Sequence, residues 1–239
     1  MDFARRGGRS ITELRALKVN LDGLARVDGS ARFAFGDTVA VASVSGPIEV
    51  RLAAENPSLS TFEVLLRPLS NVPATQSKSL AASIRAALIP SLILSQNPRT
   101  LIQLVIQALS PTRLRSSDTL VATMINASTI ALVNAGSIPM KGVVCAVAIG
   151  RIKSALIVDP SEDEETALDA SGCFAFAFGN GIDDARCVWT NWKSPRSFDE
   201  VELARCTLLA SAAAKSVWLQ TQKIFEGDES GEDDEMEIS

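Results

Sequence analysis

The order of apolar and polar residues along the chain predicts strands first, beginning with a hairpin. Apolar residues alternate over residues 31–35, the Gly36-Asp37 turn follows, and a β-branched run then occupies residues 38–44 before Gly46-Pro47. Alternation on both sides of a Gly-Asp turn is typical of two antiparallel strands. The residues alone therefore predict a paired hairpin near the start of the chain.

The same patterns predict that strands and helices alternate along the rest of the chain. Short apolar or alternating runs indicate further strands over residues 18–26, 61–67, 100–109, 143–149, 155–158, 174–178 and 186–192. Apolar residues at helical spacing indicate helices over residues 78–94, with a break at Pro90, over 116–133 and over 198–225, after a short helical turn at 11–17. Ser116-Ser117-Asp118 supplies N-caps for the second helix, which Gly136 closes.

The amino-acid composition limits the chemistry available to the chain. The 239 residues include no histidine, which excludes Ser-His-Asp and Cys-His nucleophilic sites and zinc sites with histidine ligands. Acid–base chemistry would therefore depend on carboxylates or lysines. The cysteines show no CxxC spacing, and we expect buried free thiols at Cys145, Cys173, Cys187 and Cys206.

The charge is distributed unevenly and indicates three regions. Residues 226–239 carry eight acids and no base, so 28 − 8 leaves 20 acids against 23 Lys and Arg, and the remaining body is near +3. We expect a flexible N-terminal arm at 1–10, a single domain at 11–225 and a disordered acidic tail at 226–239. No apolar run reaches the roughly 18 residues of a membrane span, and no secretory signal is recognisable, so an intracellular protein is the default expectation.

A series of short motifs gives the chain a resemblance to a known family. It opens with Asp28-Gly29-Ser30-Ala31, then F-x-x-G-D-T from Phe33 and V-x-G-P-x-E-V from Val44. Further motifs are Leu66-Arg67-Pro68, Asn97-Pro98-Arg99-Thr100, Ile125-Asn126-Ala127, Ala131 to Gly136 with Ile138-Pro139-Met140, and Leu156 to Pro160 with Glu164-Glu165. In this order the chain resembles the RNase PH family over residues 14–225, and within it the ring subunits of the eukaryotic RNA exosome.

The resemblance implies both a fold and a place in an assembly. The implied fold is α/β (α+β) and RNase PH-like, with two pseudo-repeated β-β-α halves, mixed sheets and a long C-terminal helix. The implied function is that of a non-catalytic subunit of a hexameric exosome ring, which supports 3′→5′ RNA processing and degradation by threading single-stranded RNA. Implied partners are other RNase PH-like ring subunits and RNA-binding cap subunits, in the nucleus, nucleolus and cytoplasm. No membrane partner and no cofactor are expected.

The chemistry of the family decides whether this chain is expected to be an enzyme. Phosphorolysis brings two anions together, so it needs a cationic phosphate ligand, and its leaving oxygen needs a pair of carboxylates. The resemblance assigns the carboxylates to Asp159 and Glu165, but it places the phosphate-binding arginine at Val121 and a further arginine near Ala82. Loss of such a ligand costs on the order of 10³-fold in rate, so we expect a vestigial site without a metal.

Alternative interpretations remain open for these residues. Asp159 and the acids at 162–165 form either a metal or acid site or a solvated acidic loop, and residues 116–119 either bind phosphate at a helix N-terminus or only cap the helix. An active phosphorolytic exoribonuclease, with Asp159, Glu165 and a phosphate site rebuilt at 116–119, is the second hypothesis. A nucleic-acid-binding protein that acts outside any ring is the third.

Four arginines are candidates for contact with RNA. Arg51 and Arg67 lie near strand ends, where they would line a pore, and Arg113 and Arg115 lie in a loop, where they would touch an RNA backbone. Ordinary surface arginines are the alternative, since no aromatic residues are interleaved with them for base stacking. We therefore expect this chain to guide RNA by charge at most, without reading its sequence.

Overall fold

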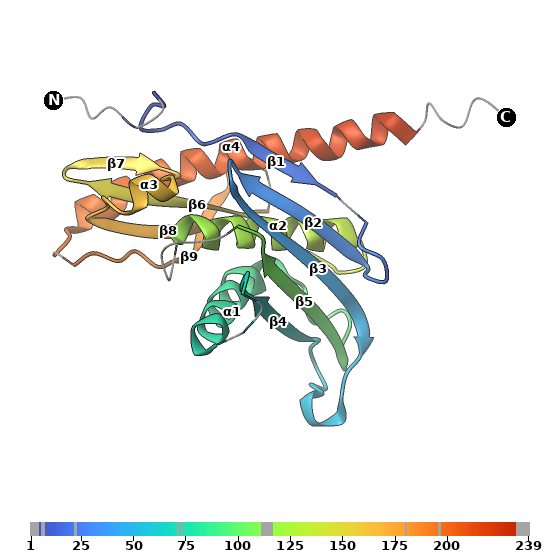
Figure 1. Ribbon diagram of the computed structural model, residues 1–239. Helices are drawn as coiled ribbons and strands as arrows, with labels where there is room; N and C mark the ends of the chain where they lie inside the picture. Colours follow the sequence, from blue (N-terminus) through green and yellow to red (C-terminus); the bar gives the residue numbers. More distant parts are fainter. Residues whose placement is uncertain are drawn as a thin grey trace.

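The computed structural model describes Arg5 and residues 8–21, 23–70, 72, 74–110, 117–179, 181–195 and 197–232, with side chains up to residue 226. It contains two sheets with a helix between them (Figure 1). The first sheet has the order β1-β2-β3-β5-β4, formed by Leu17–Asn20, Gly29–Phe35, Thr38–Glu49, Thr100–Ala108 and Thr61–Arg67. The second has the order β7-β6-β8-β9, formed by Ala155–Val158, Val143–Ile152, Ala170–Phe178 and Ala185–Thr190.

Strand pairing is antiparallel except between β4 and β5, which are parallel. Helix α1 (Thr75–Leu88) packs on β4, and the 33-residue α4 (Glu200–Glu232) packs along the second sheet and reaches β1. Short 3-10 turns lie at Leu52–Ala54 and Ile89–Ser91, and the four-residue helix α3 (Glu162–Glu165) follows β7. The expected mixed α/β fold with mixed sheets and a long C-terminal helix is confirmed.

Helix α2 (Asp118–Ala135) is the centre of the fold because both sheets pack on it. Every residue from 118 to 132 is buried, and polar residues among them such as Asp118 and Asn126 hydrogen-bond to the second sheet. The Ser117 hydroxyl accepts a hydrogen bond from the Leu120 amide at the helix start, and Gly136 ends the helix with φ of 62°.

Two residues show how closely α2 is held. Gly29 in β2 lies so near α2 that a Cβ there would be 2.5 Å from the Ala131 carbonyl oxygen. On the other side, the Asn126 amide donates to the Ala146 carbonyl of β6 (2.9 Å) and accepts from the Ala146 amide (2.7 Å). The helix is therefore fixed to one sheet by close approach and to the other by a paired hydrogen bond.

The structure differs from the sequence-based expectations at both ends of the chain. The helical turn expected at 11–17 is limited to Ile11-Thr12, since the Ile11 carbonyl accepts a hydrogen bond from the Val158 amide of β7. The first strand ends at Asn20, well before residue 26. Helix α4 continues to Glu232, beyond the expected end at 225, because no proline follows Pro195 to stop it.

The expectation of four buried thiols is wrong for Cys187, which is exposed on the edge strand β9. The pairing of β8 with β9 skips Val188, since Ala175 pairs with Trp189 and Phe176 with Cys187. Arg186 and Cys187 pair in regular register with Ala177 and Phe176, and both are exposed because β9 is the edge strand of its sheet. The other three cysteines are buried and free.

Candidate functional site

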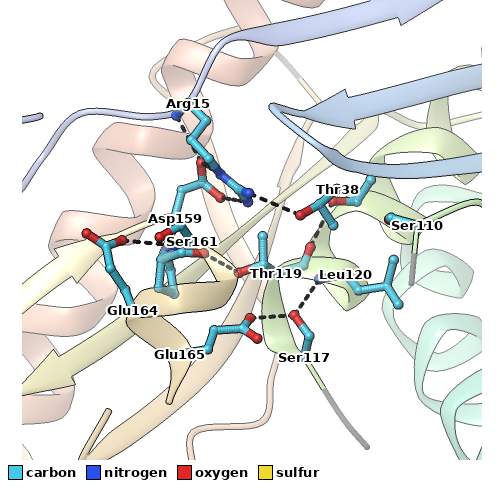
Figure 2. Close-up of polar contacts among 12 residues, drawn as sticks. Arg15, Thr38, Ser110, Ser117, Thr119, Leu120, Asp159, Ser161, Glu164 and Glu165 are labelled. Atoms are coloured by element: carbon cyan, nitrogen blue, oxygen red, sulfur yellow. Dashed lines mark hydrogen bonds and ion pairs between the residues drawn. The ribbon is translucent and has the colours of Figure 1, made fainter. Parts of the chain in front are cut away.

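Asp159, the first of the two expected carboxylates, accepts hydrogen bonds from an arginine on both of its oxygens. It follows β7 with φ of 48°, and its side chain is 1 % exposed. Arg15 donates to it from Nε (2.8 Å), from Nη2 (2.7 Å) and from its backbone amide (2.9 Å), as Figure 2 shows. Arg15 also donates to the Thr38 hydroxyl (3.0 Å). This carboxylate therefore anchors the N-terminal segment.

A second buried ion pair fixes the N-terminus. Arg5, which was expected in a flexible arm, is buried and donates to Glu164 from Nε (3.0 Å) and Nη2 (2.8 Å). Arg9 adds a contact of 3.3 Å to Glu164 and one of 3.8 Å to Asp159. Burial lowers the pKa of Arg9, and the nearby charge of Arg5 lowers it further. Arg5, Arg9 and Arg15 thus share two carboxylates.

Glu164 also stabilises the start of α3. It forms a capping box with Ser161, whose backbone amide donates to it at 2.9 Å. Burial alone would raise the pKa of Glu164, but the hydrogen bonds from Arg5 and from the Ser161 backbone lower it to about 2. Of the acids at 162–165, Glu164 is therefore a buried structural carboxylate rather than part of a solvated loop.

Glu165, the second expected carboxylate, points towards the N-terminus of α2. It accepts a short hydrogen bond from the hydroxyl of Ser117 (Figure 2). Burial raises the pKa of Glu165, against hydrogen bonds from Ser117 and Thr119 that lower it. Asp159 and Glu165 therefore have different hydrogen-bond partners, Arg15 for the first and Ser117 for the second. Ser117 acts here as an ordinary N-cap, while Ser116 lies outside the described residues.

Val121 lies one turn further along α2 and is 2 % exposed within the main core. It lines a cavity of about 650 Å³, bounded by the end of β4, by α1, by the start of α2 and by β9. We call it the α1–α2 cavity. Of the described residues that line it, Lys193 alone is charged. Ala82 is exposed on α1 and offers no hydrogen-bond donor from its side chain.

A polar network that the sequence did not indicate lies beside this cavity. Asp118 is 4 % exposed and accepts from Ser171 (2.6 Å), from Asn191 (3.0 Å) and from Lys193 (3.3 Å). Lys193 also borders a second hollow of about 430 Å³, together with Glu165 and Asp169. These residues come from distant parts of the chain, and only the fold brings them together.

The candidate RNA contacts are only partly described. Arg51 and Arg67 are exposed, at the end of β3 and the end of β4, while Arg113 and Arg115 lie outside the described residues. Within the described part of the chain, no group of three or more Asp, Glu or Cys side chains is arranged to hold a metal ion. No described helix is long and apolar enough to cross a membrane.

Comparison with known proteins places this geometry in a family. Two profiles of the 3′ exoribonuclease family (RNase PH), domain 1 and domain 2, match residues 13–137 and 142–213. The chain belongs to the RNase PH family. The resemblance read from the motifs is thereby confirmed, and each of the two sheets falls within one of the two RNase PH domains.

Several relatives within the RNase PH family carry exosome names. The "Exosome complex exonuclease RRP46 homolog" of Oryza sativa is 30% identical over 74% of this chain and 72% of its own length. The "Exosome complex component RRP46" of Saccharomyces cerevisiae is 34% identical over 66% and 72%. The Rrp41 component of Archaeoglobus fulgidus is 30% identical over 76% and 71%.

Solved structures agree with the RNase PH assignment. Rice Rrp46 superimposes with a TM-score of 0.79 at 26% identity, covering 91% of this chain and 98% of the rice chain. A chain of an archaeal exosome core gives a TM-score of 0.75 at 20% identity, covering 91% of each chain, and this second likeness concerns the fold alone.

Proposed function

We propose that this chain is a non-catalytic ring subunit of an RNA exosome core, which supports 3′→5′ RNA processing and degradation by helping to form the channel that threads single-stranded RNA. Its partners are other RNase PH-like ring subunits and RNA-binding cap subunits, in the nucleus, nucleolus and cytoplasm. The relatives named as exosome components, which match most of its length, support this assignment.

The observation that carries the absence of catalysis is the apolar environment of Val121. A phosphate dianion needs cationic or N–H donors, and a valine that is 2 % exposed supplies neither. The one charged residue among the described lining, Lys193, is 3.3 Å from Asp118 and is partly neutralised by it. Asp159 is similarly held by Arg15, which donates to both of its carboxylate oxygens.

An active phosphate-dependent exoribonuclease is the second candidate, and one contact favours it. Glu165 has a raised pKa, is hydrogen-bonded to Ser117 at the start of α2, and borders a polar hollow with Asp169 and Lys193. A carboxylate whose pKa is raised by burial is better suited to donate a proton to the leaving oxygen than an exposed one. One relative also carries the word exonuclease in its name.

The test is a phosphorolysis assay on the purified chain, alone and assembled with its ring partners. Single-stranded RNA labelled at its 3′-terminal nucleotide is incubated with inorganic phosphate and Mg²⁺, beside an active RNase PH enzyme as positive control. The expected result is no phosphate-dependent release of nucleoside diphosphate by the chain alone, and none in the ring that depends on residues of this chain.

The contacts of each carboxylate determine which substitution tests catalysis without also disturbing the fold. Asp159→Asn would break the contact with Arg15, so a loss of activity would confuse catalysis with folding. Glu165→Gln keeps an acceptor for Ser117, and Asp163→Asn on the same short helix is an exposed control. Phosphate-dependent release that Glu165→Gln abolishes and Asp163→Asn preserves would establish the exoribonuclease and overturn the proposal.

A further inference from the structure

Arg151 is a buried cation whose hydrogen-bonding capacity is not fully used. It lies near the end of β6 and is 9% exposed. Its Nη1 donates to Glu202 in the first turn of α4, and its Nη2 donates to the Ser194 hydroxyl at 3.0 Å. Its Nε is buried and has no hydrogen-bond partner among the described residues. A buried donor without a partner is costly, so this nitrogen requires an explanation.

The unpaired atom belongs to the edge of the guanidinium that binds anions elsewhere in this chain. Arg15 holds Asp159 through Nε (2.8 Å) and Nη2 (2.7 Å), as Figure 2 shows, and Arg5 holds its carboxylate through the same two atoms. This fork matches the geometry of carboxylates and phosphates. In Arg151 the same edge meets one neutral hydroxyl, that of Ser194, and therefore has a donor left for an anionic oxygen.

The position of Ser194 indicates how an anion would reach this edge. A free anion has poor access to Arg151, because that residue is nine-tenths buried, whereas the Ser194 hydroxyl already contacts it. A phosphate group on the Ser194 oxygen carries three acceptor oxygens, enough to meet both Nε and Nη2. Ser194 also borders the hollow of about 430 Å³, which leaves space beside its hydroxyl.

The segment that carries Ser194 is suited to binding a protein kinase. Pro195 follows it, and Ser-Pro is the dipeptide that proline-directed kinases recognise. The described residues among 194–198 make no backbone–backbone hydrogen bond to another described residue. An isolated bridge between Lys193 and Ser171 is the backbone contact next to them. Such a segment can adopt the extended form that a kinase requires by opening this bridge and the bond to Arg151.

We propose that Ser194 is a phosphorylation site for a proline-directed protein kinase, and that Arg151 receives the phosphate. The Ser194 oxygen attacks the γ-phosphorus of ATP, so that a new O–P bond forms and the bond to the β,γ-bridging oxygen breaks. The hydroxyl proton passes to a carboxylate of the kinase, and ADP leaves. The phosphoserine then binds the Nε and Nη2 edge of Arg151, while Nη1 keeps Glu202.

The modification would change the second hollow and the start of α4. The charged side chains that line the hollow are Glu165, Asp169 and Lys193. A phosphate at its rim adds close to two negative charges, which repel an RNA backbone from this side of the chain. The new contact with Arg151 also fixes the segment before α4 to the second sheet. This regulation goes beyond the proposed ring role and does not depend on it.

The first experiment asks whether the site is modified. The purified full-length chain is incubated with Mg²⁺-ATP and one of two kinases, a cyclin-dependent and a mitogen-activated one, and phosphopeptides are mapped by mass spectrometry. Phosphate is expected on Ser194, lost in Ser194→Ala and kept in Ser197→Ala, an exposed serine of the same segment without a following proline. No phosphate on Ser194, from kinases that modify a Ser-Pro peptide, overturns the proposal.

The second experiment tests the role of Arg151 through the rate at which a phosphatase removes the phosphate. Removal from Ser194 should be about tenfold faster in Arg151→Lys, because lysine cannot form the paired hydrogen bonds. Phosphate placed on Ser110, the other serine before a proline, should leave at one rate in both chains, since the described partner of its hydroxyl is the Val39 backbone.

A further variant keeps the test decisive if Arg151→Lys lowers the thermal unfolding midpoint. Glu202→Gln retains Arg151 and removes the anion that competes for it, so it should slow the loss of phosphate from Ser194. Equal rates in the wild type and in both variants would show that the phosphate does not bind Arg151, and would overturn that part of the proposal.

Discussion

At the level of single residues, Asp159 and Glu164 tie the N-terminal segment to the loop after β7. Their carboxylates are almost fully buried, and each is bonded in a bidentate manner by one arginine. Paired charge-assisted hydrogen bonds of this kind are among the stronger polar contacts in proteins. The loop that carries Glu165 is therefore held in place from outside the second sheet.

Glu164→Gln should destabilise the protein most strongly near neutral pH. The substitution leaves the buried Arg5 without its counter-charge, which costs about 3 kcal/mol. The pKa of Glu164 is lowered from 4.5 to about 2, so its contribution is complete above 4.5 and is lost as the pH falls towards 2. Urea unfolding of wild type and variant at several pH values should show their difference shrinking over this window.

Asp163→Asn is the control for this series, because Asp163 is exposed in the same short helix. It should change the free energy of unfolding by less than about 0.5 kcal/mol. A difference between wild type and Glu164→Gln that stays constant from pH 7 to pH 2 would contradict the assignment of the ion pair as its source.

The sequence indicates some of the contacts in this region and not others. Ser161 and Glu164 have the spacing of a capping box, so the sequence contains a signal for the role of Glu164 at the helix start. It contains none for the arginine partners of Glu164, because Arg5 is 159 positions away and no periodic pattern connects the two. The contacts of Asp118 with Asn191 and Lys193 could not be predicted for the same reason.

At the level of elements, the packing of α2 depends on the close approach of β2 to the helix backbone. Gly29 allows β2 to contact the helix backbone at Ala131 and Ala135, where a methyl group has no space. The apolar periodicity predicted the helix and most strands to within a few residues, because burial on both faces leaves a strong sequence signal. Irregular points such as the bulge at β9 depend on the pairing between strands, and they leave no signal in the sequence.

Gly29→Ala should therefore lower stability by about 2–3 kcal/mol, as expected for overpacking against backbone atoms. Gly23→Ala is a matched control, since a Cβ there meets no atom within 4 Å. Thermal unfolding should show a clearly lower midpoint for Gly29→Ala and a nearly unchanged one for Gly23→Ala. Equal midpoints for the two variants would show that β2 has room to move away from the helix.

At the level of the whole molecule, the acidic C-terminal residues reverse the sign of the charge. The body is near +3 and the full chain is −5, because residues 226–239 contribute eight acids and no base. Phe225 of helix α4 still packs against the core, and the helix continues beyond it into the first of these acidic residues. We therefore expect the tail to weaken any attraction between the chain and the RNA backbone.

Removal of residues 226–239 should strengthen non-specific binding of single-stranded RNA by about tenfold at low salt, with the gain fading as salt screens the charges. Fluorescence anisotropy of a labelled oligonucleotide over a salt series measures the change. A full-length variant with all eight acids replaced by Asn or Gln should behave in the same way. If only the truncated chain binds more tightly, the tail acts by its bulk and not by its charge.

The burial of α2 on all sides has a consequence for the newly made chain. The helix is complete at Ala135, but the sheet that covers one side of it is finished only at Thr190. At about 5–20 residues per second, the ribosome takes on the order of several seconds to supply these residues. During that time the nascent chain presents an unprotected apolar helix, so slow translation between the two halves favours aggregation and engagement by chaperones.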